Sequence, residues 1–462
     1  MRTLVLFTRD LRVHDHPALA AACRRGADVL PLFVLDPALT AISPNRHRFL
    51  LECLADLDRE LGRRGGRLVL RRGEAAAVAV TLAVEAGCDS IHVTADVGTV
   101  AGRRERDLAD HCRQAGIALE VVPGNAVVEP GEVVPAGRDV YSVFTPYHQA
   151  WVQTPRRSIL QAPATVPVPR EVDPGPRPDL ASVAPDSPRL PAGGESAGRA
   201  LLQAWVAGPV RRYGAARDLL AADGTSRLSP YLRFGCISAN EVVHRSEPEE
   251  FVRQIAWRDF YRQLLGHDPR LSTVDHRRGD VVAPPPNADE LLDAWRRGRT
   301  GIPLVDAGMR QLLEEGWMHN RARMVVGSFL TRRLGIPWQE GARHFLRLLV
   351  DGDPANNSGG WQWVAGTGTD PRRSRSFNPV LQAQRYDPDG VYIHRWVSEL
   401  AGVAPPLLFA PWSDPSLLRT TAYPEPVLQV PTKGSGARRV PGSPVFGGQA
   451  SFDGLSGAAS AG

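Results

Sequence analysis

Two kinds of hydrophobic periodicity divide the chain. Over residues 1–122, short apolar runs rich in Val, Leu and Ile alternate with stretches whose apolar residues recur every three or four positions. The runs predict strands and the stretches predict amphipathic helices. Strands are expected at Thr3–Phe7, Val29–Val34, Arg67–Leu70, Ser90–Val93 and Ala118–Val122. Strands that alternate with helices favour an α/β domain with a doubly wound parallel sheet.

From about Ala200 to Leu400 the periodicity is helical, which predicts an all-α second domain. Helices are expected at Glu249–Leu265, Ala288–Arg297, Ile302–Glu315, Arg321–Leu334 and Trp338–Val350. Residues 161–191 hold nine prolines and indicate an extended connector. Residues 431–462 hold eight glycines and indicate disorder. We therefore divide the chain into residues 1–125, a linker at 126–198, a helical domain at 199–420 and a disordered tail at 421–462.

Composition narrows the function only slightly. The net charge is +5, and 54 of the 55 basic residues are arginine, a skew typical of coding bias. The charge permits binding to a polyanion without requiring it. No apolar run reaches the length of a membrane span, and the N-terminus lacks a signal peptide. The five cysteines form no CxxC pair, so we expect buried thiols in a reducing cytoplasm and no metal site. We also expect a monomer.

The densest candidate chemistry lies in residues 317–363. Trp317–Met324 and Asp351–Trp363 place amides, paired charges and tryptophans between apolar helical runs. That mixture predicts a buried site for a large, flat, polar ligand. The Arg9–Arg12 loop after the first strand could border a site, or its charges could simply pin the fold. No GxGxxG follows this strand, so a dinucleotide fingerprint is absent.

Four motifs in order resemble one family. They are Arg9–Asp15 with Pro17–Leu19, Gly224–Gly235, Trp257–Tyr261 and the 317–363 stretch. Over about residues 2–400 the chain resembles the photolyase/cryptochrome flavoproteins, and most closely the class I photolyases of cyclobutane pyrimidine dimers. The resemblance implies an α/β antenna domain, a linker and a helical FAD domain. It also implies a carbon–carbon lyase that uses light and reduced FAD to split dimers extruded from UV-damaged DNA.

The resemblance also assigns the flavin site. Small hydroxyl side chains and backbone N–H groups suit phosphate oxygens, although Gly-Thr-Ser alone would suggest a helix N-cap. Asp351 and Asp353 could likewise be caps around Gly352. The cofactor-binding residues implied are Tyr213, Thr225, Ser226, Arg227, Leu228, Ser229, Trp257, Arg258, Asn320, Arg323, Asp351, Asp353 and Asn357.

Catalytic residues follow in the same way. Trp257 and Trp363 match the walls of the lesion pocket, and Asn320 and Met324 complete it. Asn357 matches the residue that faces flavin N5. Asn320 stands where (6-4) photolyases have a second histidine, which favours cyclobutane dimers. Gln254 replaces the usual glutamate that hydrogen-bonds the dimer, so a cryptochrome and a (6-4) photolyase remain alternatives.

Electron transfer, antenna and DNA contacts complete the expectations. Trp361 and Trp338 match the two inner tryptophans of the family's electron route, whereas Pro285 aligns with the outer one. Arg103 stands where folate-binding relatives have glutamate, so an 8-hydroxy-deazaflavin is favoured over methenyltetrahydrofolate as second chromophore, and none is a further alternative. The residues expected to contact DNA are Arg217, Arg321 and Arg375.

Overall fold

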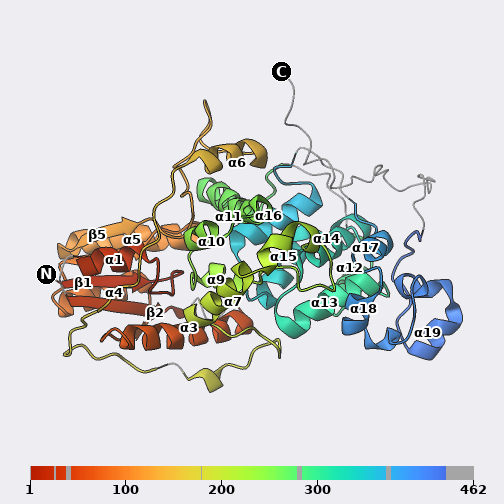
Figure 1. Ribbon diagram of the computed structural model, residues 1–462, viewed down its shortest axis with the longest axis horizontal. Coiled ribbons are helices and arrows are strands. Elements are labelled where there is room, and N and C mark those ends of the chain that lie inside the picture. The colour runs from red at the N-terminus through yellow and green to blue at the C-terminus, as the bar shows by residue number, and fades with distance from the viewer. Residues whose placement is uncertain are drawn as a thin grey trace.

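The computed structural model describes residues 2–24, 28–37, 43–177, 179–277, 284–370 and 376–432. Its N-terminal part is a five-stranded parallel sheet in the order β3-β2-β1-β4-β5 (Figure 1). The strands are β1 (Arg2–Phe7), β2 (Asp28–Leu35), β3 (Val69–Arg72), β4 (Ser90–Thr94) and β5 (Ala118–Val122). The predicted doubly wound sheet is therefore confirmed, with every expected strand present.

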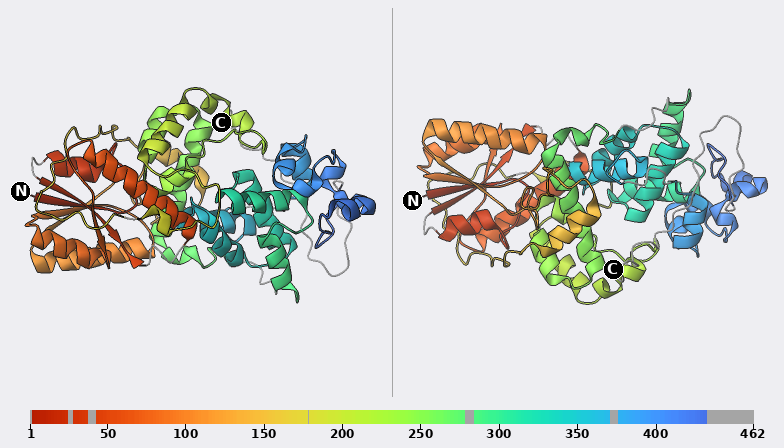
Figure 2. Two further views of the ribbon diagram at one scale, coloured as in Figure 1. Left: turned by 90° about the horizontal axis from the view of Figure 1, so that it is seen from below. Right: turned by 90° about the horizontal axis from the view of Figure 1, so that it is seen from above.

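Helices cover both faces of this sheet (Figure 2). They are α1 (Pro17–Arg24), α3 (Pro44–Gly62), α4 (Ala75–Glu85) and α5 (Thr99–Ala115). Alternate residues of β1 point to opposite faces, as strand geometry requires. Val5 and Phe7 join the core under α1 and α3, whereas Leu4 and Leu6 join the core under α4 and α5. The strand order reverses beside β1, which puts the loop after β1 where α/β sheets usually bind ligands.

The predicted linker is more structured than its prolines indicate. Backbone bonds from Val29 N–H to Pro167 and from Leu70 N–H to Pro174 hold its extended part beside the sheet. Before this part, however, helix α6 (Phe144–Gln153) packs against helix α11 (Glu249–His267). Its buried aromatic residues are Phe144, Tyr147 and Trp151. Their spacing is helical, so the aromatic pattern marks a helix inside the predicted linker.

The second domain is helical, as expected. Its helices are α7 (Glu195–Val206), α8 (Tyr213–Ala216), α9 (Ser229–Phe234), α10 (Ala239–Arg245), α11, α12 (Ala288–Arg296), α13 (Pro303–Glu315), α14 (Asn320–Ser328), α15 (Trp338–Leu348), α16 (Pro354–Ala365), α17 (Pro379–Tyr386), α18 (Val391–Trp396) and α19 (Pro415–Thr421). One expected helix is divided: α14 ends at Ser328 and a π-helical turn, Phe329–Arg333, follows.

The two domains meet through backbone contacts of the loop after β1. Leu11 N–H donates to the carbonyl of Phe234, and the Arg12 guanidinium donates to the carbonyl of Gly235. Gly235 has φ +66°, and a Cβ there would lie 2.0 Å from the carbonyl oxygen of Arg9. This close approach requires glycine. Glu195 on α7 accepts the N–H groups of Val13 and His14 at the same boundary.

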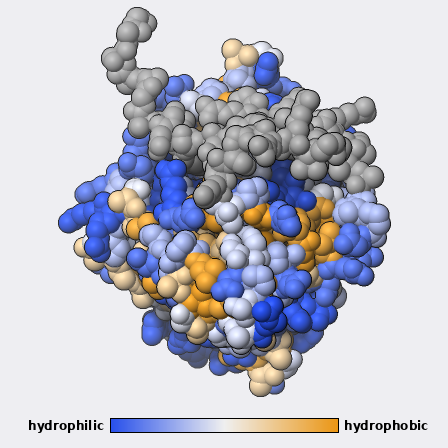
Figure 3. Space-filling model, turned by 90° about the vertical axis from the view of Figure 1, so that its right-hand side faces the viewer, coloured by the Kyte–Doolittle hydropathy of each residue, from blue (hydrophilic) through white to orange (hydrophobic). Residues whose placement is uncertain are grey.

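The helical domain extends past its expected end. Tyr423 and Val430 are 3% and 4% exposed, because they pack into the core of this domain. Residues 421–432 therefore belong to the fold and not to the predicted tail, and residues 433–462 lie outside the described part. The end of the molecule near α17–α19 has a mainly hydrophilic surface with small apolar patches (Figure 3). Among the described residues, no helix is long and apolar enough to cross a bilayer.

Candidate functional site

A buried ion pair is the centre of the candidate site. Two guanidinium nitrogens of Arg323 on α14 donate to the Asp351 carboxylate at 2.7 and 3.2 Å. The Ser229 hydroxyl at the start of α9 donates to the same carboxylate at 2.6 Å. The Asp351 side chain is only 4% exposed, so the pair is largely shielded from water. Residues of α9, of α14 and of the turn between α15 and α16 thus fix one cation, and Asp351 is not a helix cap.

Asp353 has two roles in the structure. Its carboxylate caps α16 by accepting the backbone N–H of Asn356 at 3.0 Å, so the capping alternative applies to this residue. The same carboxylate accepts a 2.5 Å bond from Arg9, which reaches over from the α/β domain. Burial raises the pKa of Asp353, but the positive charges of Arg9 and Arg233 outweigh it and hold the pKa well below its usual range. The Arg9 loop therefore borders the site and also ties the domains together.

Buried guanidinium groups surround these carboxylates. Burial lowers the pKa of Arg46, on α3, to about 10, despite the attraction of Asp351 and Asp353. Burial and the neighbouring Arg9 lower the pKa of Arg233 to about 9. Arg46 Nη1 has no hydrogen-bond partner among the described residues. Buried positive charges with too few partners attract an anion. The site therefore suits a negatively charged ligand, such as a cofactor with phosphate groups.

Residues 225–228 form a loop directly before helix α9. Helix α9 begins at Ser229, and its N-cap residue is Leu228, without a side-chain capping bond. The alternative that Gly-Thr-Ser forms an N-cap is therefore wrong. Arg227 has φ +50° and its guanidinium lies 4.4 Å from the ring centroid of Trp317. Trp317 Nε1 donates to Ser229, which connects this loop to the ion pair.

Asn357 presents one defined atom. Its side-chain nitrogen donates to the carbonyl of Ala342 on α15 at 3.1 Å. The amide oxygen is then the atom available to accept a hydrogen bond from a ligand. Arg258 instead pairs with Asp259 at 3.1 Å and is 14% exposed. Both residues are expected to bind the cofactor. Asn357 can offer its amide oxygen to it, whereas the guanidinium of Arg258 is already paired with Asp259.

The expected lesion walls stand on two helices in contact. Trp257 is on α11 and Trp363 on α16, and a Cβ at Gly359 would lie 2.2 Å from the Tyr261 ring, so glycine lets these helices approach closely. The Trp257 ring stacks on Phe144 with centroids 3.6 Å apart and planes 6° apart. One face of Trp257 is therefore occupied by the linker helix.

The polar lesion residues are accessible. Asn320 is exposed at the start of α14, and its amide approaches Met324 Sδ at 3.8 Å. The Gln254 amide nitrogen donates to the carbonyl of Glu250, one turn earlier in α11. This bond uses one of the two amide N–H groups, so the second N–H and the amide oxygen of Gln254 can bind a substrate.

The structure separates the three arginines expected at DNA. Arg217 is half-buried, with its guanidinium 5.8 Å from the ring centroid of Tyr213. Arg321 is buried at 3% exposure and pairs with Asp218 at 2.8 Å, so we do not retain it as a phosphate contact. Arg375 lies outside the described residues.

Sequence reasoning missed several neighbours of the site. Phe144 and Arg46 come from the linker and the α/β domain, so no local motif placed them there. His319 caps α14 through Nδ1, and burial lowers its pKa to about 4, which keeps the imidazole neutral. The aromatic spacing of α6 is the one signal that would have revealed Phe144.

Comparison with known proteins agrees with this geometry. Residues 3–170 match the DNA photolyase family, and residues 251–439 match the FAD binding domain of DNA photolyase. A deoxyribodipyrimidine photo-lyase of Streptomyces griseus is 49% identical, covering 92% of this chain and 96% of the relative. A cryptochrome DASH of Gloeobacter violaceus is 35% identical and covers 88% of each. The structure of a bacterial class III photolyase from Agrobacterium tumefaciens has a TM-score of 0.86 at 30% identity, covering 93% of this chain and 94% of that one. The chain therefore belongs to the photolyase/cryptochrome family of flavoproteins.

Proposed function

We propose that this protein is a light-dependent deoxyribodipyrimidine photo-lyase that binds FAD non-covalently and splits cyclobutane pyrimidine dimers in DNA. The observation that carries the proposal is the buried Arg323–Asp351 pair, held by Ser229 between the 225–229 loop and α16. The Streptomyces griseus relative is named for the same activity. When bound and reduced, FAD supplies a chromophore that gives up an electron on absorbing light.

The chain's own residues hold and polarise the cofactor. We assign the phosphates and ribityl chain to the loop side of the site, formed by Tyr213, Thr225, Ser226, Arg227, Leu228 and Ser229. The ring side has Arg323, whose charge is fixed by Asp351 and favours negative charge on a reduced ligand. Asn357 accepts a hydrogen bond there without adding negative charge, and Asp353 meets the ring edge. Trp257, Arg258 and Asn320 complete the assignment.

The lesion pocket is assigned to the face between α11 and α14–α16. Trp257 and Trp363 offer aromatic surface to an extruded pyrimidine dimer, and stacking of a base on an aromatic ring contributes about 1–3 kcal/mol. Asn320 and Met324 lie one helical turn apart at the start of α14. Gln254 supplies a neutral amide where a carboxyl group would carry charge or a proton.

Photoreduction of the flavin is assigned to Trp361 and Trp338. Both belong to the core of the helical domain, and the Trp361 ring lies against Gly341, one turn after Trp338 on α15. A Cβ at Gly341 would lie 2.1 Å from that ring, so glycine permits the contact. Pro285 has no redox-active side chain, so the route lacks the outer tryptophan. The rate of photoreduction therefore depends on whether another residue takes the place of the outer tryptophan as electron donor.

Repair of a defined substrate tests the function. UV-treated oligothymidine is mixed with chemically reduced protein under blue light, and the recovery of thymine absorbance is measured. We expect recovery that depends on light and on the reduced flavin. A protein that binds and reduces its flavin but restores no absorbance would refute the assignment. Oligonucleotides that carry only cyclobutane or only (6-4) lesions separate the two repair activities.

A cryptochrome-type photoreceptor is the second candidate, favoured by Gln254 and by the likeness to the Gloeobacter violaceus cryptochrome DASH. It predicts flavin photochemistry without repair of duplex DNA. Equal repair of single-stranded and duplex substrates, or repair of the duplex alone, supports the photo-lyase.

We further propose an 8-hydroxy-deazaflavin as second chromophore. Arg103, at the position of the folate-binding glutamate, is exposed and basic. Chromophores released from the purified protein are identified by absorption and chromatography. A folate, or flavin alone, would refute this choice.

A further inference from the structure

Three buried tryptophans near the expected electron route differ in what their indole N–H groups contact. Trp361 Nε1 has no hydrogen-bond partner among the described residues, and the side chain is 4% exposed. Trp295, with its ring centroid 6.1 Å from that of Trp361, donates to the carbonyl of Val326 at 3.0 Å. Trp338 donates to a carboxylate oxygen of Asp275 at 2.6 Å. Of these three, only Trp338 is bonded to a group that can take a proton.

We propose that Asp275 accepts the indole proton of Trp338 after Trp338 has lost an electron, which makes Trp338 the terminal protein donor in photoreduction. The proposal rests on the proposed function and names a positioning residue for its electron route. Loss of an electron makes an indole N–H strongly acidic. A carboxylate within hydrogen-bond reach is the geometry that a general base requires.

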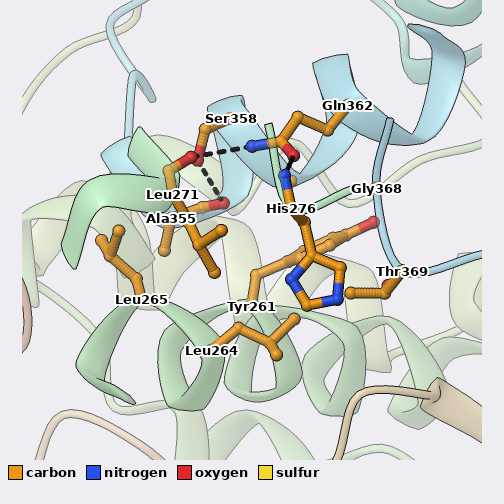
Figure 4. A pocket seen from close by; sticks show the side chains of 11 residues that line it. Tyr261, Leu264, Leu265, Leu271, His276, Ala355, Ser358, Gln362, Gly368 and Thr369 are labelled. Atoms are coloured by element: carbon orange, nitrogen blue, oxygen red, sulfur yellow. Dashed lines mark hydrogen bonds between the residues drawn. The ribbon is translucent and has the colours of Figure 1, made fainter. Parts of the chain in front are cut away.

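The loop that carries Asp275 is fixed to the helix that carries Trp361. Gln362, next to Trp361 on α16, donates to the carbonyl of Leu271 and accepts the N–H of His276 (Figure 4). It also donates to the carbonyl of Val274. The residues on both sides of Asp275 are thus clamped to α16. Asp275 itself is half-buried, so a proton received from the buried indole can pass on to solvent.

The proposed sequence balances electrons and protons. With FAD bound and excited by light, Trp361 would give up one electron to it, and the Trp361 cation would take one electron from Trp338. The Trp338 cation loses its N–H proton to Asp275, leaving a neutral radical and a carboxylic acid. A soluble thiol then returns a hydrogen atom to Trp338, and Asp275 releases its proton to water. Two such thiyl radicals combine to one disulfide.

Deprotonation at Trp338 compensates for the outer tryptophan that Pro285 replaces. In a longer route, distance from the flavin slows the return of the electron. Here the neutral Trp338 radical must recover its proton before an electron can return to it from the flavin. The charge-separated state therefore lasts longer. The negative charge of Asp275 also favours the Trp338 cation over cations on Trp361 or Trp295.

Transient absorption after a laser flash tests this, because cation and neutral tryptophan radicals have different visible bands. Asp275→Asn keeps a hydrogen-bond acceptor but removes the base. We expect the wild type to form the neutral radical with a solvent deuterium effect, and Asp275→Asn to form it about 100-fold more slowly. Asp268→Asn, in a carboxylate of the same segment paired with Arg270, is the matched control and should behave as wild type. Bound-flavin absorbance verifies that each variant is folded.

Two results overturn the inference. One is a neutral radical that forms in Asp275→Asn at the wild-type rate. The other is a long-lived radical that persists in Trp338→Phe, which would place the hole on Trp295 or another residue. Repair by chemically reduced wild-type protein bypasses this route. Its failure would refute the proposed function, whereas its success beside either result above would refute the Asp275 inference alone.

Discussion

Removing the guanidinium of Arg323 should release the flavin. In Arg323→Leu, the Asp351 carboxylate, 4% exposed, keeps the Ser229 hydroxyl as its one hydrogen-bonding side chain among the described residues. Breaking a buried ion pair on one side costs about 3–5 kcal/mol, and because the Arg323 side chain is 25% exposed we take the lower limit, about 3 kcal/mol. An unpaired carboxylate facing a negatively charged ligand penalises binding by this amount. Since about 1.4 kcal/mol corresponds to tenfold, the dissociation constant for FAD should rise by about 100-fold.

Titration of flavin-free protein with FAD, followed by flavin fluorescence, measures this constant. The double variant Arg323→Leu/Asp351→Asn removes the stranded charge and should recover at least about tenfold of the lost affinity. Arg310→Leu is a matched control, because Arg310 forms a bidentate pair with Glu399 elsewhere in the same domain. It should lower stability without changing the FAD constant. Unchanged FAD binding in Arg323→Leu, or strictly additive losses in the double variant, would refute the reasoning.

Three further changes have defined outcomes. Gln254→Glu should raise dimer splitting per absorbed photon by about fivefold, because a protonated carboxyl group can give its proton to the electron-rich dimer and so stabilise it by about 1 kcal/mol more than an amide can; an equal or lower quantum yield contradicts this. Arg217→Ala should reduce the slope of log Kd against log salt for damaged duplex by about 0.9, if this side chain neutralises one phosphate; an unchanged slope removes Arg217 from the interface. The lowered pKa of Asp353 means that the unfolded chain binds its proton more readily. Its contribution to stability is thus complete above about pH 5 and is lost as pH falls below the unfolded pKa of about 3.9. In denaturant titrations at several pH values, the free energy of unfolding of Asp353→Asn should fall less than that of the wild type as the pH drops below about 5. An equal fall in both proteins would contradict this.

Local pattern was sufficient for the sheet and most helices, because the central strands are short apolar runs buried on both faces and most helices bury one regular face. It failed where backbone geometry depends on distant partners. The π-helical turn at Phe329–Arg333 continues an apolar helical pattern, so periodicity alone does not separate it from α14. Helix α6 was hidden because nearby prolines dominated the interpretation of the linker.

The candidate site shows the same difference between what local sequence pattern reveals and what contacts between distant residues decide. Arg323 and Asp351, both assigned to the cofactor by the resemblance, form an ion pair, and both lie within the expected stretch. Arg321, two residues away, turns to Asp218 and lies with its guanidinium 4.3 Å from the Tyr386 ring centroid, partners that no local pattern reveals. The bond from Arg9 to Asp353 joins residues in different domains, so only the folded chain shows it. Sequence thus identifies which side chains are available, and tertiary contacts decide which face the ligand.

The bond from Arg9 to Asp353, with Gly235 fitted against the Arg9 backbone, has a consequence for engineering. A chimera that joins this α/β domain to the helical domain of a relative must retain both this arginine and this glycine. The α/β domain can therefore be exchanged only between relatives that have the same two residues at the domain boundary. A chimera without this arginine would leave Asp353, the N-cap residue of α16, without its partner from the α/β domain. The lost contact would lie beside the candidate flavin site.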